Sequence, residues 1–185
     1  ALYLGEPQSL QALEVTDDPR VKRNWRAFTE PEASGHRYAV IEAMSEGVVF
    51  TTFEHSVGEA DAVAVLRPRL TDAQRREMVM RAFSHYGKPY DFEFDFFSTD
   101  RLVCTEVVYR ALDGMIALPL TPILGRRALP AVGFVKLYAE TRGREDRPFD
   151  LIYFLDADEG RLRAVRGSED VFLETLQRKG VTFLP

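Results

Sequence analysis

The sequence contains few of the residues on which metal sites and disulfides depend. Its 185 residues include one cysteine, three histidines and one tryptophan. A single cysteine excludes an intramolecular disulfide and any multi-cysteine metal cage, and His36, His55 and His85 lack the close spacing of zinc ligands. We therefore expect neither a metal nor a cofactor. Long hydrophobic runs are also missing, since stretches such as 47–50 and 116–120 are far too short to cross a bilayer.

An excess of positive charge is missing as well. The formal net charge is −5 at pH 7, which gives no broad attraction for nucleic acid, so we expect no nucleic-acid partner. The hydrophobic fraction is 45%, with 13 phenylalanines and 7 tyrosines. That is ample material for one buried core, and the length fits one compact domain.

Strand and helix patterns alternate along the chain. Two β-rich runs at 37–43 and 47–53 flank a turn and predict a hairpin. Thr71 can cap a helix that ends at Gly87. The polar stretch 16–35 is expected to be a long loop. Further elements are expected as helices at 103–112, 132–141 and 168–179, a strand at 62–66, and a hairpin made of 149–156 and 161–165.

Cys104 is the first candidate for chemistry. A lone cysteine is most often an inert, small hydrophobic residue in a core. Cys104, however, follows a turn-rich stretch and opens a run, 105–112, with helical character. A thiol at a helix N-terminus lies at the positive end of the helix dipole, which favours the thiolate and can stabilise an oxyanion. Its position alone is compatible with Cys104 as a buried core residue and with Cys104 as a nucleophile.

Two motifs carry a resemblance to a known family. Residues 87–92 read Gly-Lys-Pro-Tyr-Asp-Phe, and residues 100–109 read Asp-Arg-Leu-Val-Cys-Thr-Glu-Val-Val-Tyr. Together they resemble the signature of the circularly permuted papain-like amidases, a permuted branch of the NlpC-type cysteine peptidase superfamily. In that family the cysteine-bearing helix follows the histidine-bearing strand. Residues 40–43 and 64–68 resemble the β-core of the same family.

The resemblance implies a papain-like α+β fold, in which a small antiparallel sheet packs against helices. It implies a single domain over residues 1–185. Within this domain, residues 1–112 would form the catalytic core, and residues 113–185 would be a C-terminal elaboration of it.

The resemblance also assigns roles to three residues. Cys104 would be the nucleophile, Glu42 would orient the catalytic histidine, and Tyr90 would help to line the oxyanion site. Strand alternation supports Glu42, because Glu42 shares one face of its strand with Tyr38 and Val40. The alternatives are a solvated strand carboxylate for Glu42 and simple packing for Tyr90.

The catalytic histidine is where the sequence departs from the family pattern. In the family this histidine sits just before a strand that Ala1–Gly5 resembles, so we expect it to precede Ala1. His36 is the best substitute within the chain, and His55 is a weaker one. His85 is interpreted as a surface residue or a satisfied core residue.

The implied activity is that of a cysteine hydrolase or amidase, acting through a thiolate and a thioester acyl-enzyme on amide or ester bonds. Cell-wall peptides and lipid acyl groups are both candidate substrates, since the resembled relatives include peptidoglycan peptidases and lecithin retinol acyltransferase. The alternatives are a catalytically inactive papain-fold domain that binds a small-molecule, peptide or lipid ligand, and a structural domain with Cys104 buried. Open questions are the oligomeric state, an upstream membrane anchor, and a location in the cytoplasm or the bacterial cell envelope.

Overall fold

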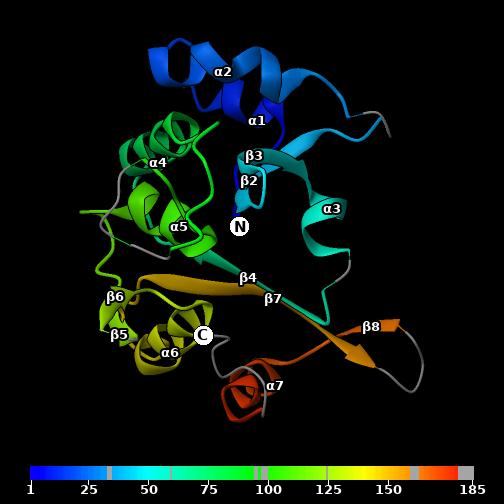
Figure 1. Ribbon diagram of the computed structural model, residues 1–185. Coiled ribbons are helices and arrows are strands. Elements are labelled where there is room, and N and C mark those ends of the chain that lie inside the picture. Colours follow the sequence, from blue (N-terminus) through cyan, green and yellow to red (C-terminus); the bar gives the residue numbers. More distant parts are fainter. Residues whose placement is uncertain are drawn as a thin grey trace. The chain divides into compact units, whose positions relative to one another are not determined.

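The computed structural model describes residues 1–32, 35–58, 60–93, 96, 100–123, 125–158 and 163–178. The chain divides into two compact units, Ala1–Gly58 with Leu70–Leu129, and Glu59–Arg69 with Pro130–Pro185. The described strands pair into small antiparallel sheets that pack with helices (Figure 1). The predicted mixed α+β class is therefore confirmed.

The first unit is built around the sheet β1-β2-β3. Its described elements are β1 (Leu2–Tyr3), α1 (Pro7–Ala12), α2 (Pro19–Thr29), β2 (Tyr38–Met44), β3 (Gly47–Thr52), α3 (Phe53–Val57), α4 (Asp72–Ser84), α5 (Cys104–Leu112), β5 (Thr121–Ile123) and β6 (Arg126–Ala128). Strand β2 is the central strand, and both α3 and α5 contact it.

The predicted β2–β3 hairpin is confirmed, and Gly47 explains its tight turn. Glu42 lies opposite Val49, and Met44 lies opposite Gly47. Gly47 has a φ of 113°, and a Cβ atom there would lie 2.5 Å from the carbonyl oxygen of Lys88. A side chain at this position would therefore meet both backbone strain and a backbone clash.

Helix α4 follows its predicted course because both of its ends are specified. Thr71 accepts a hydrogen bond from the Gln74 backbone N–H, and the Gln74 side chain accepts one from the Thr71 N–H, which forms a capping box. The buried face of α4 brings Phe83 into an aromatic core with Phe28 and Phe50, whose ring centroids lie 5.0–5.2 Å apart. This core fixes α4 against α2 and β3.

The loop predicted at 16–35 is wrong, because α2 occupies Pro19–Thr29. Asp18 caps this helix by accepting a hydrogen bond from the Arg20 backbone N–H at 2.8 Å, and Pro19 suits the first helical position. Val21 and Phe28 are buried on one face of the helix. Pro19 thus marks a helix start, and the apolar spacing over two turns outweighs the polar composition.

The second unit is a sheet of order β4-β7-β8 with its own core. Phe154 and Phe172 are buried, with ring centroids 5.4 Å apart, and Tyr138 packs on Phe172. The predicted hairpin and the 132–141 helix are confirmed, whereas the turn at Glu159 and Gly160 lies outside the described residues. Its described elements are β4 (Ala62–Pro68), α6 (Ala131–Thr141), β7 (Phe149–Asp158), β8 (Arg163–Arg166), α7 (Glu169–Glu174) and the 3-10 helix η1 (Thr175–Gln177).

Across the part of the chain that the structure describes, no helix combines the length and apolarity that a membrane crossing requires.

Candidate active site

Cys104 is the first residue of α5, and its side chain is exposed. The two residues before it, Leu102 and Val103, are buried, so the chain emerges from the interior where the thiol begins. The first backbone N–H groups of a helix have no acceptor within that helix. An electrophile at Cys104 would therefore meet both a reachable thiol and hydrogen-bond donors. The structure bears out the helix start and the exposure of Cys104, and a substrate groove at Cys104 stays a prediction.

A short backbone segment, 87–91, connects the β2–β3 hairpin to the approach to Cys104. Gly87 N–H donates to the Val48 carbonyl at 2.8 Å, and Val48 N–H donates to the Lys88 carbonyl at 2.7 Å. Tyr90 then forms a parallel β-bridge with Leu102. This arrangement gives a structural reason for the Gly-Lys-Pro-Tyr-Asp motif, which aligns the sheet with the residues just before α5.

Tyr90 lies close enough to Cys104 for the two groups to interact electrostatically. Burial, followed by the charges of Cys104 and Asp91, raises the pKa of the half-buried Tyr90 phenol. The Tyr90 hydroxyl is protonated at neutral pH, as in any tyrosine whose pKa is not lowered, so it can donate a hydrogen bond. The structure thus brings together two of the residues predicted for the site.

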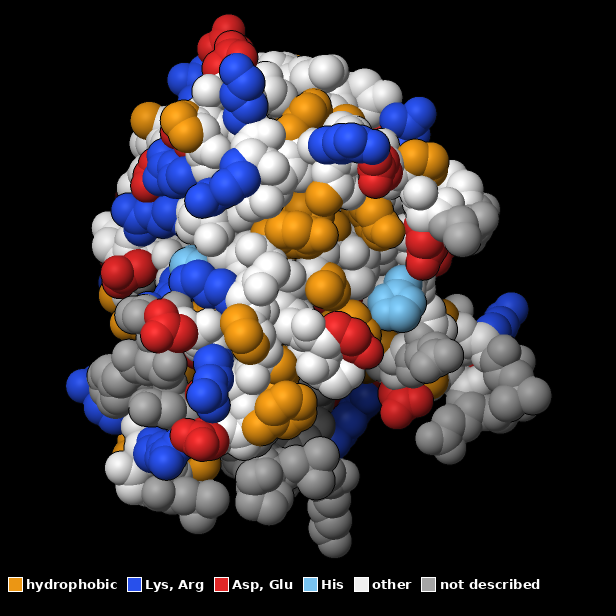
Figure 2. Space-filling model, turned by 45° about the horizontal axis from the view of Figure 1, so that its top comes forward, with side chains coloured by type: hydrophobic (Ala, Val, Ile, Leu, Met, Phe, Trp, Pro, Cys, Tyr) orange, Lys and Arg blue, Asp and Glu red, His pale blue; other side chains and the backbone are white. Residues whose placement is uncertain are grey.

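Exposed aromatic side chains belong to the same unit. The Phe92 ring centroid is 4.9 Å from that of Tyr90, and Phe92 is 68% exposed. Tyr3 and Phe53, also exposed, make an edge contact at 6.2 Å. On the face drawn in Figure 2, hydrophobic side chains gather near the middle, and lysine and arginine side chains concentrate on the left. Phe92 thus offers apolar surface close to Tyr90. Phe94 and Phe97, which follow Phe92 in the sequence, lie outside the described residues.

Glu42 is a half-buried carboxylate on the central strand β2, held by two hydroxyl groups. Thr51 Oγ1 donates to one carboxylate oxygen at 2.5 Å, and Ser56 Oγ donates to the other at 3.2 Å. These contacts argue against a freely solvated side chain. The hydrogen bonds described for Glu42 go to Thr51 and Ser56 and to no histidine, so the orienting role of Glu42 stays a prediction.

The three histidines have different surroundings. His36 precedes β2, and its exposed ring carries Nδ1 at 3.2 Å from a Glu54 carboxylate oxygen. His55 is exposed on α3. His85 follows α4, and its buried Nδ1 has no hydrogen-bond partner among the described residues. Burial, assisted by Lys88 and Arg110, lowers the pKa of His85 to about 4. His85 is therefore neutral at pH 7, and its unpartnered Nδ1 argues against the satisfied core residue, one of the two interpretations drawn from the sequence.

Sequence reasoning missed two charged residues on the Cys104 helix. Glu106 is completely buried, and Arg110 Nη2 lies 2.5 Å from its carboxylate. Two patterns could have revealed the pair, namely a glutamate in the first helical turn, where it can cap the helix, and an arginine one turn later. The resemblance assigned a role to Cys104 in this motif and none to Glu106 or Arg110.

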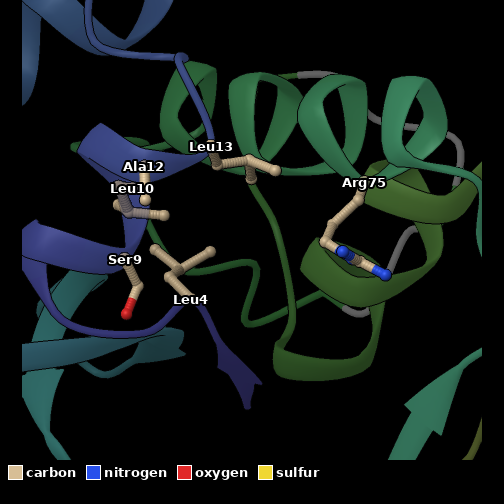
Figure 3. A pocket seen from close by; sticks show the side chains of 6 residues that line it. All are labelled: Leu4, Ser9, Leu10, Ala12, Leu13 and Arg75. Atoms are coloured by element: carbon tan, nitrogen blue, oxygen red, sulfur yellow. The ribbon is translucent and has the colours of Figure 1, made fainter.

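A separate hollow lies between the end of β1, α1 and the start of α4. Its volume is about 320 Å³. Figure 3 shows Leu4, Leu10 and Leu13 along it, with Arg75 at one side. Neither Cys104 nor Glu42 lines this hollow. Among the described residues there is also no cluster of three or more histidine, cysteine, aspartate or glutamate side chains suited to a metal ion.

Comparison with known proteins gives one match. The family model described as permuted papain-like amidase enzyme, YaeF/YiiX, C92 family, matches residues 6–143. The matched region includes β2, the 87–91 segment and all of α5. No curated protein matches the chain, and no solved structure matches it.

Proposed function

Because the chain belongs to the permuted papain-like amidase family, we propose that it is a cysteine hydrolase with Cys104 as its nucleophile, acting on amide or ester bonds. One observation carries the assignment to this residue. Cys104 is the single cysteine of the sequence, and it is exposed in the first turn of a helix whose preceding residues are buried. This placement suits a reactive thiol and differs from that of an inert core cysteine.

The proposed reaction proceeds in two acyl-transfer steps. A base takes the thiol proton while Sγ of Cys104 attacks the substrate carbonyl carbon, which produces a tetrahedral oxyanion. Backbone N–H groups at the start of α5 and the protonated Tyr90 hydroxyl would donate hydrogen bonds to that oxyanion. The protonated base gives its proton to the leaving amine or alcohol, and a thioester forms. Water, deprotonated by the same base, then attacks the thioester, releases the acid and returns the thiol.

Glu42 is proposed to orient the base. A carboxylate beside an imidazole fixes its tautomer and stabilises its protonated form. Leu2 pairs with Ile41 in the antiparallel β1–β2 ladder, so one further step of that register sets Ala1 opposite Glu42. If the register continued upstream, a histidine directly before Ala1 would lie opposite Ala43 and on the other face of the sheet, whereas a histidine two residues before Ala1 would share the face of Glu42. This register supports the expected upstream histidine over His36, whose ring lies against Glu54.

The nature of the acyl group is the finer part of the proposal. Cell-wall peptides and lipid acyl groups are both compatible with the thioester chemistry. The exposed Phe92 ring, packed against Tyr90, supports a substrate with an apolar group next to the scissile carbonyl, because burial of such a group against an aromatic face is favourable.

The test combines labelling with hydrolysis. The unaltered chain, Cys104→Ala and Cys104→Ser are treated with an electrophilic acylating probe, and the labelled residue is identified by mass spectrometry. Hydrolysis of thioester, ester and amide model substrates is then compared between a chain extended upstream of Ala1 by a segment that carries a histidine, the same extended chain with that histidine changed to alanine, and the chain from Ala1. Hydrolysis that Cys104→Ala removes supports the proposal.

Two outcomes would replace the proposal. Labelling no faster than that of a free cysteine, with no hydrolysis of any substrate, would favour a papain-fold domain that only binds its ligand. Equal activity of all three forms, lost on His36→Ala, would move the base to His36 and contradict the upstream assignment.

A further inference from the structure

Glu106 is an unusual residue for the first turn of a helix, because its carboxylate is buried. The side chain has no exposed surface, and burial, opposed by Arg110, raises the pKa of its carboxyl group. Burying a charge is costly unless partners compensate it. The partners of its two carboxylate oxygens must therefore offset the cost of burial.

The two carboxylate oxygens of Glu106 connect the start of α5 to its next turn. One oxygen accepts a hydrogen bond from the backbone N–H of Val103 at 3.4 Å. The other accepts hydrogen bonds from Nε and Nη2 of Arg110 at 2.8 and 2.5 Å. Val103 is the N-cap residue and has no side-chain acceptor of its own. Glu106 therefore supplies the side-chain cap at the residue next to Cys104.

Arg110 extends this network to the segment before Cys104. Its Nη2 also donates to the backbone carbonyl of Phe96 at 3.4 Å. A guanidinium group presents several donors in a fixed plane, so it can hold a carboxylate and a carbonyl together. The pair thus connects the backbone before the nucleophile to the body of α5.

Other charged groups surround the pair. Glu106 interacts electrostatically with Asp91 in addition to Arg110. Arg110 in turn acts on His85 and Lys88, and Lys88 is also influenced by Asp100. Burial, followed by Arg110, lowers the pKa of Lys88. The charge balance next to Cys104 therefore depends on Glu106 and Arg110 together.

We propose that Glu106 and Arg110 are positioning residues for Cys104, which fix the Val103 backbone so that the thiol and the first amides of α5 face the substrate together. This inference deepens the proposed function and rests on it. Neither residue touches the reacting atoms. Their effect passes through the peptide unit that precedes the nucleophile, where small displacements reduce the rate strongly.

The decisive variant replaces both partners. Glu106→Leu combined with Arg110→Met removes the ion pair without leaving a lone buried charge, and such exchanges are often neutral for stability. We expect the double variant to stay folded, with kcat of the full-length protein reduced about 10- to 100-fold and KM unchanged. Glu106→Gln keeps an acceptor for the Val103 N–H, so it should retain more activity than Glu106→Leu.

Alkylation of Cys104 by iodoacetamide provides a readout that needs no hydrolysis. Glu106→Gln removes a negative charge two residues after the nucleophile on the same helix, so the pH at which the alkylation rate is half-maximal should fall by about half a unit. Arg101→Met is the matched control, since Arg101 is an exposed arginine close to Cys104 that lies 4.0 Å from Glu93. It should leave kcat unchanged.

A structural role and a positioning role give different results. A double variant with a lower melting temperature but wild-type kcat and an unchanged alkylation profile, measured well below that temperature, would overturn the inference. Failure of the proposed function would look different, because hydrolysis would then be absent from the unaltered protein, and only the alkylation profile would respond to Glu106→Gln.

Discussion

The first unit buries charged side chains, whereas the charged side chains that the structure describes in the second unit are at least partly exposed. Among the described residues, the buried charged side chains are Asp91 and Glu106, and both belong to the first unit. In the second unit the Arg144–Asp146 and Arg147–Asp150 pairs are solvent-accessible. Buried charges reduce stability unless they are fully paired. Proteins that retain them often do so at functional sites, and here the buried charges adjoin Cys104.

The strongest test of this comparison is Glu42→Gln in the first unit. Glutamine keeps an oxygen that can accept from Thr51 or Ser56, but it loses the charge that would stabilise an imidazolium. We expect kcat/KM for ester hydrolysis to fall about 10³- to 10⁴-fold, as for other residues that orient a catalytic histidine. Glu46→Gln, exposed in the turn of the same hairpin, is the matched control. Equal activities of the two variants would reduce Glu42 to a structural residue.

A second prediction concerns the backbone of the first unit. Gly47→Ala should lower the free energy of unfolding by about 2–4 kcal/mol, because it combines a strained φ with a clash against the Lys88 carbonyl. Denaturant unfolding measures this loss. Gly125→Ala is the control, since Gly125 has a φ of 80° but open space around it. A loss no greater for Gly47→Ala than for Gly125→Ala would contradict the clash.

The lowered pKa of His85, in the first unit, predicts that the stability of the protein depends on pH. Its pKa is about 4 in the folded protein and 6.5 in the reference state. A proton therefore binds the unfolded state more tightly, and stability should fall as pH decreases from 6.5 towards 4. The loss should be about 1–2 kcal/mol, allowing for partial solvent access. In His85→Leu, the free energy of unfolding measured with urea should no longer show this decrease between pH 6.5 and pH 4. An unchanged pH dependence in His85→Leu would show that other groups cause the loss of stability.

The smallest effect is expected in the second unit. Burial and Glu169 raise the pKa of Tyr138 to about 12, and its hydroxyl donates to the Glu169 carboxylate at 2.7 Å. Tyr138→Phe should destabilise the protein by about 1 kcal/mol and leave Cys104 alkylation and hydrolysis unchanged. Phe172→Leu, a core change in the same unit, provides a reference for purely structural damage. Altered alkylation in Tyr138→Phe would break the contrast between the units.

Local patterns made much of the fold predictable. The hairpin of β2 and β3 followed from alternation and a turn, and the Thr71 capping residue located α4. The loop prediction for the region of α2 was wrong because its polar composition is typical of loops, although Asp18 and Pro19 are signals for the start of a helix. The error shows that a proline can mark the beginning of a helix as readily as a loop.

The site was predictable only in part. The resemblance singled out Cys104, and the structure supports its accessibility at a helix start. Burial of Glu106 and the pairing of Glu42 with Thr51 and Ser56 could not be predicted, because they depend on which segments meet in space. The sequence also could not reveal that His85 lacks a hydrogen-bond partner for its buried ring nitrogen.

The bridge between Tyr90 and Leu102 has a consequence for how this family can vary. Residues 87–91 are bonded to the hairpin at one end and to Leu102 at the other. Each residue of an extended strand advances the chain by about 3.3 Å, so an insertion within 87–91 would displace the segment before the nucleophile by that distance. Relatives should therefore keep the length of the 87–91 segment constant.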